Sequence, residues 1–84
     1  MSETLSPSAR TAEVQKATLD WVAELLEDSA IRPEDNFLDL GGHSMLALQL
    51  NQQAKERFGA EYDIQTLFEG TLAEAAAHLA GRLN

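Results

Sequence analysis

The sequence predicts an all-α fold, a bundle of three longer helices and one short helix with a long loop between the first and second helices. Apolar residues recur at helical spacing in three separate segments, and no segment alternates polar and apolar residues as a half-buried strand would. Glycine, proline or capping residues separate these segments. With 84 residues, 44% of them hydrophobic, the chain has room for one small domain with a single packed core.

The net charge of the chain indicates which classes of macromolecule it can bind. Asp and Glu total 14 against 6 Lys and Arg, a formal net charge of -8. Such a chain repels nucleic acid and anionic membranes, so basic protein partners are expected instead. The absence of cysteine excludes disulfides and thiolate zinc sites and is compatible with a reducing cytoplasm. Since the sequence has no apolar signal or membrane-spanning stretch, we expect a soluble, cytoplasmic protein. We also expect a monomer without a metal ion.

The first helix is expected over residues 11–27, after a flexible polar segment at residues 1–10. Its apolar stripe, which recurs at helical spacing, consists of Val14, Thr18, Trp21, Val22 and Leu25. Residues 11–84 would then form the folded domain.

Residues 28–43 are typical of a long loop. They contain turn-forming residues, namely Pro33, Asn36, Gly41 and Gly42. They also contain apolar residues, several of which are expected to pin the loop onto the core: Ile31, Phe37, Leu38 and Leu40. A loop of this length in a compact domain is often functional.

The second helix is expected over residues 44–58, with Gly59 as its C-terminal stop, and it carries two apolar faces. Residues spaced four apart form a stripe that faces the core: Leu46, Leu50, Ala54 and Phe58. Met45, Leu48 and Gln52 lie on a different side. Because no charged residue occurs between residues 44 and 54, this second side suits contact with another protein. The alternative is that Met45 or Leu48 packs under the loop.

Capping residues define the two remaining helices. Asp63 is expected to cap a short helical turn over residues 64–68, which Gly70 ends. Thr71 and Glu74 form a T-x-x-E capping box. The box opens a last helix whose apolar residues are Leu72, Ala76, Leu79 and Leu83.

Ser44, at the start of the second helix, allows three interpretations. Local physics alone favours a helix N-cap. A catalytic nucleophile is disfavoured, because Leu46 replaces the last glycine of G-x-S-x-G, His43 is merely adjacent, and His78 is expected to face solvent on the last helix. In the third interpretation Ser44 is the substrate of another enzyme. The preceding glycines leave space for a foreign active site, and helix amides favour a phosphodiester.

The stretch "DNFLDLGGHSMLALQL" closely resembles the phosphopantetheine attachment motif of peptidyl carrier proteins, the thiolation domains of nonribosomal peptide synthesis. Asp-Asn-Phe occupies residues 35–37, Leu-Gly-Gly-His-Ser occupies residues 40–44, and the apolar pair Met45 and Leu46 follows. The order of the expected helices also matches the four-helix carrier-protein bundle over nearly the whole chain.

The resemblance implies a carrier that catalyses nothing and is itself the substrate of a phosphopantetheinyl transferase. That enzyme would attach 4'-phosphopantetheine from coenzyme A to Ser44. The thiol of the arm would hold an aminoacyl, peptidyl or related acyl group as a thioester. Its partners would be adenylating, condensing, tailoring or thioesterase enzymes of antibiotic-type or hybrid natural-product biosynthesis, and tethering would raise the effective concentration of the cargo.

The resemblance also assigns roles to individual residues. Gly41 and Gly42 would give access to Ser44, and His43 matches the motif without a firm physical role. Met45, Leu48 and Gln52 would contact partner enzymes. Phe37, Leu40 and Leu46 have the character of packing positions that hold the loop and the helix start.

Two features bear on the subtype. His-Ser-Met and the uncharged first half of the second helix favour the peptidyl class over fatty-acid carriers, which commonly show Asp-Ser-Leu and an acidic helix. A polyketide-type or other acyl carrier, and an unmodified carrier-like interaction domain, remain alternatives. Six acids against Arg32 alone between residues 24 and 39 would steer basic partners or form a solvated surface.

The chain departs from the family at "FEGTLAE", which lacks the proline of Phe-Glu-x-Pro-Thr and is one residue shorter, so the turn between the last two helices is expected to differ. From its start methionine and its end after the last helix, we expect a free-standing carrier that acts in trans.

Overall fold

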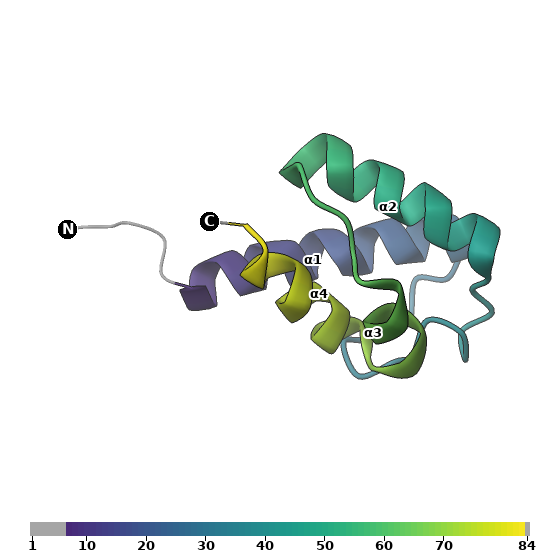
Figure 1. Cartoon of the computed structure of the whole chain (residues 1–84). Coiled ribbons are helices and arrows are strands. Elements are labelled where there is room, and N and C mark those ends of the chain that lie inside the picture. The colour runs from purple at the N-terminus through teal and green to yellow at the C-terminus, as the bar shows by residue number, and fades with distance from the viewer. Residues whose placement is uncertain (1–6, 84) are drawn as a thin grey trace.

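The computed structural model describes residues 7–83, with side chains from Ala9 onward, and these residues form four α-helices and no strand. The helices are α1 (Pro7–Leu26), α2 (Ser44–Phe58), α3 (Ile64–Glu69) and α4 (Leu72–Gly81). In Figure 1, α2 and α4 lie on different sides of the long α1, and α3 lies beside α4 and the loop of residues 27–43. The predicted all-α fold with its long first loop is therefore confirmed.

Helix α1 begins at Pro7, whose fixed φ suits the first helical turn, rather than at Thr11. Of the segment expected to be flexible, residues 1–6 lie outside the described residues. Arg10 belongs to the helix, and its Nη1 donates to the Leu83 carbonyl oxygen at 2.8 Å. This bond ties the start of α1 to the end of α4.

Helix α1 ends in a left-handed residue that is not glycine. Glu27 has a φ of 54°, and the Asp28 amide donates to the Ala23 carbonyl at 3.0 Å. The Glu27 amide donates to the Glu24 carbonyl at 3.3 Å, which completes a Schellman motif. The motif turns the chain sharply into the long loop.

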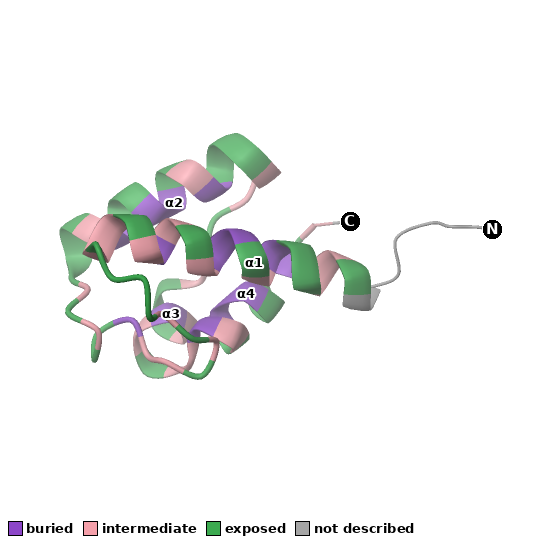
Figure 2. Ribbon diagram, turned by 180° about the vertical axis from the view of Figure 1, so that it is seen from behind, coloured by how far each residue is buried: buried purple, intermediate pink, exposed green. Residues whose placement is uncertain are grey.

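The core draws on all four helices and on the loop. Figure 2 shows the buried residues on the sides of α1, α2 and α4 that face one another. The fully buried large apolar side chains are Phe37, Leu50, Leu67, Leu72, Leu79, Val14 and Val22. Of the predicted α2 stripe, Leu50 and Ala54 are fully buried, whereas Leu46 and Phe58 are partly buried. The partly buried Trp21 ring meets the Phe58 ring edge-to-face, with centroids 5.8 Å apart.

The predicted helix ends of α2 and α3 are confirmed. Gly59 has a φ of 79°, and its amide donates to the Lys55 carbonyl at 2.9 Å. The Asp63 carboxylate accepts from the amide and the hydroxyl of Thr66, at 2.9 and 2.7 Å. These bonds, the hydroxyl's first, lower the pKa of Asp63. The short helix extends to Glu69, one residue beyond the expected range.

The turn between α3 and α4 consists of Gly70, the C-cap of α3, and Thr71, the N-cap of α4. Thr71 and Glu74 form the predicted capping box. A Cβ on Gly70 would collide with the Glu74 carboxylate and lie 3.1 Å from the Thr66 carbonyl oxygen. A side chain at residue 70 would therefore displace the Glu74 carboxylate from its capping position.

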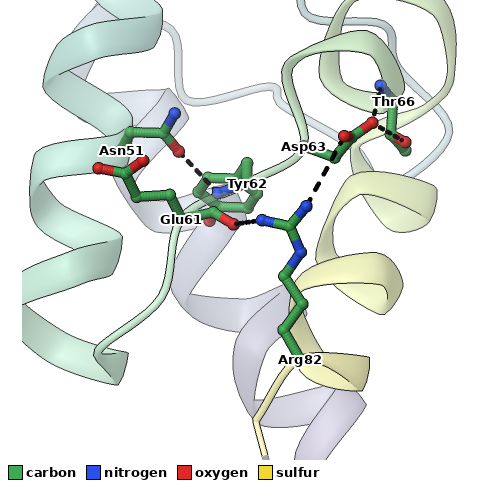
Figure 3. A network of polar contacts seen from close by, with 6 residues as sticks. All are labelled: Asn51, Glu61, Tyr62, Asp63, Thr66 and Arg82. Atoms are coloured by element: carbon green, nitrogen blue, oxygen red, sulfur yellow. Dashed lines mark hydrogen bonds and ion pairs between the residues drawn. The ribbon is translucent and has the colours of Figure 1, made fainter.

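Polar contacts hold the connection between α2 and α3. The Asn51 side chain, from α2, accepts from the Tyr62 amide at 2.7 Å. Figure 3 shows the Arg82 side chain reaching from the end of α4 to the Glu61 carbonyl at 2.8 Å and to the Asp63 carboxylate at 3.7 Å. The sequence analysis did not predict the role of the buried Asn51, because its partner is a backbone amide in the loop after α2.

The buried Tyr62 hydroxyl reaches across to α1, where it lies 2.6 Å from the Thr18 hydroxyl. Thr18 uses its single hydrogen to donate to the Val14 carbonyl at 2.7 Å, so Tyr62 is the donor of this pair. Burial raises the pKa of Tyr62 to about 12.

Replacing a fully buried α2 side chain tests the core. We expect Leu50→Ala to lower the free energy of unfolding by about 2–5 kcal/mol, because the cavity adds to the lost burial. Denaturant unfolding followed by circular dichroism measures this loss. The matched control is Gln49→Ala, an exposed neighbour on the same helix, which should stay within about 0.5 kcal/mol of the wild type. A Leu50→Ala loss as small as the control's would place Leu50 outside the core.

The Tyr62 hydroxyl makes folding sensitive to alkaline pH. Its folded pKa lies above the unfolded value of 10.0, so its contribution is complete below pH 10 and is lost as pH rises through about 12. We expect the free energy of unfolding to fall by up to roughly 3 kcal/mol over that range through this group. Near-ultraviolet absorbance reports its ionisation directly, since Tyr62 is the only tyrosine of the chain.

The control is Tyr62→Phe, which removes the ionisable group and leaves Thr18 bonded to Val14. At neutral pH this variant should lose about 0.5–1.5 kcal/mol, the value of one hydrogen bond. Its stability should then decline less steeply than that of the wild type between pH 10 and pH 12. Parallel curves for the two proteins would contradict the assignment.

Candidate functional site

Ser44 is the first residue of α2, and its side chain is exposed. The N-cap is His43, which is extended at φ -153° and ψ -179° and whose carbonyl accepts from the Ala47 amide at 2.9 Å. The N-cap interpretation of Ser44 is therefore wrong. No hydrogen bond within residues 7–83 uses the Ser44 hydroxyl, so this hydroxyl is available to an approaching enzyme.

The two glycines before His43 are required by geometry. Gly41 has a φ of 103°, a conformation that side chains rarely adopt. A Cβ on Gly42 would lie 2.5–2.6 Å from carbons of the Phe37 ring. The backbone of Gly42 therefore rests directly on the buried ring, a role that the sequence analysis, which assigned these glycines only to access, did not find.

The loop that leads to Ser44 is a series of tight turns. The Asn36 carbonyl accepts from the Leu40 amide at 3.1 Å, and the Asn36 side-chain oxygen accepts from the Asp39 amide at 2.9 Å. The Gly42 amide then donates to the Phe37 carbonyl at 2.9 Å. These short-range bonds leave residues 36–42 little freedom to rearrange.

Bonds from α3 and α4 anchor the same loop. The Asn36 side-chain nitrogen donates to the Phe68 carbonyl at 3.0 Å and to the Gly70 carbonyl at 2.7 Å. The Asp35 carbonyl accepts from the Leu72 amide at 2.8 Å, so the loop also satisfies the first turn of α4. The Phe37 and Phe68 rings are nearly parallel, with centroids 6.3 Å apart.

The apolar residues of the loop are not all buried. Phe37 is fully buried, and Ile31 and Leu40 are partly buried, as the pinning of the loop requires. Leu38 is 44% exposed, so it is not one of the several apolar residues that pin the loop.

The second face of α2 is open to solvent. Met45 is 62% exposed and Leu48 is 66% exposed, so neither packs under the loop, and the Gln52 side chain is exposed as well. Leu48 and Gln52 also line a shallow groove with Asn51, Lys55, Glu56 and Glu61. Ile64, at the start of α3, is a further exposed apolar side chain, and the sequence analysis did not single it out.

The described residues provide no catalytic arrangement around Ser44. His43 and His78 are both exposed, and neither makes a hydrogen bond to Ser44. Within residues 7–83, no three His, Asp or Glu side chains gather as metal ligands would. In the same part of the chain, no helix has both the length and the apolar character needed to cross a bilayer.

The acids of residues 24–39 are mostly exposed, and Arg32 forms only a surface ion pair with Glu34 at 3.5 Å. Such pairs contribute little to stability in water. This segment therefore remains a solvated, strongly negative part of the surface.

Comparison with known proteins identifies the class. The model of the family described as "Phosphopantetheine attachment site" matches residues 17–79, and the chain belongs to this family. The family is defined by covalently attached 4'-phosphopantetheine. The exposed Ser44 hydroxyl, which is not engaged in capping, is chemically suited to form the phosphodiester that such a group requires.

Individual relatives belong to large synthases. The chain is 39% identical over 79 residues to a dimodular nonribosomal peptide synthase of Bacillus subtilis (strain 168), covering 93% of this chain and 3% of the relative. It is 40% identical over 70 residues to malpibaldin synthetase of Mortierella alpina, covering 82% of this chain and 1% of the relative. The polyketide synthase PksN of Bacillus subtilis (strain 168) is 37% identical over 57 residues, 68% of this chain and 1% of the relative.

These relatives and the family match confirm the resemblance to carrier proteins of nonribosomal peptide synthesis. The chain spans only a few per cent of the length of these relatives. No solved structure matches the chain.

Proposed function

We propose that Ser44 is the attachment point of 4'-phosphopantetheine and that the chain presents acyl cargo to the enzymes of nonribosomal peptide synthesis. The thiol of the arm supplies the chemistry, by holding an aminoacyl, peptidyl or related acyl group as a thioester. The observation that carries the proposal is the exposed Ser44 hydroxyl, without a hydrogen bond from any described residue, at the helix start inside the family motif.

In this reaction Ser44 would supply the nucleophilic hydroxyl, and the transferase would supply the general base. The Ser44 oxygen would bond to the pantetheine-bearing phosphorus of coenzyme A, and the bond from that phosphorus to the nucleotide would break. A phosphopantetheinyl transferase must accept the hydroxyl proton, because no described side chain is bonded to Ser44. The first amides of α2 and its dipole would favour the resulting phosphate ester.

Met45, Leu48 and Gln52 form the surface that we propose partner enzymes contact. The two apolar side chains are largely exposed, and they follow Ser44 on the same helix. The partners would be the transferase and then adenylating, condensing, tailoring or thioesterase enzymes. The acids of residues 24–39 would favour basic partner surfaces in solution. In this role the chain would act as a monomeric carrier in the cytoplasm, where coenzyme A is present.

A second candidate, an acyl carrier of polyketide assembly, has support from the identity to a polyketide synthase. The two candidates differ in how the arm is loaded. An adenylating enzyme would load an amino acid in the first case, and an acyltransferase would load an acyl group in the second. Mass spectrometry of the chain, first modified with phosphopantetheine and then incubated with each class of enzyme, distinguishes them.

Incubation with coenzyme A and a broad-specificity phosphopantetheinyl transferase tests the attachment residue. Intact-protein mass spectrometry should show one added phosphopantetheine on the wild type and none on Ser44→Ala. The control is Ser29→Ala, which changes an exposed loop serine and should leave the addition intact. Modification of Ser44→Ala, or an unmodified wild type with several transferases, would refute the proposal.

Kinetics of the same transfer test the exposed face of α2. Met45→Ala should raise the KM for the carrier several-fold while changing the free energy of unfolding by at most about 0.5 kcal/mol, because the side chain is 62% exposed. Leu50→Ala should show the opposite pattern, a loss of stability with an unchanged KM while the protein remains folded. If Met45→Ala unfolds the domain, the two faces of α2 have been assigned in reverse.

A further inference from the structure

We propose that Asn36 is a positioning residue for the modification of Ser44, although it does not touch that serine. This inference rests on the proposed function and adds a specific residue to it. Asn36 fixes the loop onto the junction of α3 and α4, and the loop in turn sets the place of Ser44.

The side-chain amide of Asn36 makes three hydrogen bonds. Its two hydrogens go to the carbonyls of Phe68 and Gly70, at 3.0 and 2.7 Å. Its oxygen accepts from the Asp39 amide at 2.9 Å. One side chain thus joins the C-terminal end of α3 to the turn that leads to the attachment site. Few other side chains offer two donors and an acceptor in this compact geometry.

The next link runs through Phe37. This residue follows Asn36 directly, and its buried ring lies against the Phe68 ring and under Gly42. The Gly42 amide donates back to the Phe37 carbonyl at 2.9 Å. Because Gly42 has no side chain, the ring and the backbone are in direct contact, and movement of either displaces the other.

Only His43 separates Gly42 from Ser44, so the position of Gly42 fixes where α2 begins. Loss of the Asn36 bonds would leave two carbonyls and the Asp39 amide without partners and would release the turn. Leu48 and Gln52 would stay in place, because they lie beyond the first turn of α2, where the Ala47 amide donates to the His43 carbonyl at 2.9 Å. Docking would therefore be kept, while the hydroxyl would be presented less accurately.

The test is steady-state kinetics of phosphopantetheine transfer to Asn36→Ala, with the carrier as the varied substrate. We expect kcat to fall about tenfold or more, since small misplacements of a reacting group are costly, while KM changes less than about twofold. The stability-matched control is Val14→Ala. It removes a buried side chain near the opposite end of α2, close to Phe58, and should leave kcat unchanged. In amide NMR spectra of the unmodified proteins, the resonances of residues 42–45 should shift in Asn36→Ala only.

A second variant keeps the proposal testable if Asn36→Ala does not fold. Gly42→Ala places a methyl group against the Phe37 ring and should lower kcat similarly, and adding Phe37→Leu should restore part of the loss by making room. An Asn36→Ala or Gly42→Ala carrier with the kcat of the wild type would overturn the inference, as would an equal loss in Val14→Ala. A wild type that accepts no phosphopantetheine would instead refute the proposed function itself.

Discussion

The contact between the Phe37 ring and the Gly42 backbone constrains the loop that leads to Ser44, the proposed attachment point. The ring is fully buried, and a single added carbon on Gly42 would overlap it. Close packing of this kind cannot be relaxed without moving either the core or the loop. The loop is thereby joined to the hydrophobic core only two residues before Ser44.

The two shortest helices act as a platform for this loop. Helix α3 has only 6 residues, too few to be stable alone, and it is held by the Asp63 cap and by the Asn36 side chain at its other end. The start of α4 uses loop carbonyls as well as its own capping box. Structure and function are coupled here, since the groups that complete the helix ends also order the loop that presents Ser44.

The two faces of α2 differ in burial, so the side chains that stabilise the core are not the ones proposed to contact partner enzymes. Leu50 and Ala54 are fully buried, whereas Met45 and Leu48 are left to solvent by the same helix. A small domain has little apolar surface to spare, so large exposed apolar side chains beside the proposed attachment point support the proposed contact with partner enzymes. The Ser44 hydroxyl is also left accessible, since no described residue forms a hydrogen bond with it. If Ser44 capped the helix, its oxygen would instead accept a hydrogen bond from a backbone amide.

Local periodicity and spacing along the chain were enough to establish the fold class, the extent of α2, the caps at Asp63 and Thr71, and the motif around Ser44. The three-dimensional packing was needed to show that His43 rather than Ser44 is the N-cap, that Leu38 is exposed, and that Asn36 bonds to α3. Tyr62 and Asn51 are further examples, since their partners lie in other elements. Such contacts join residues distant along the chain, and helical periodicity carries no information about which distant groups meet.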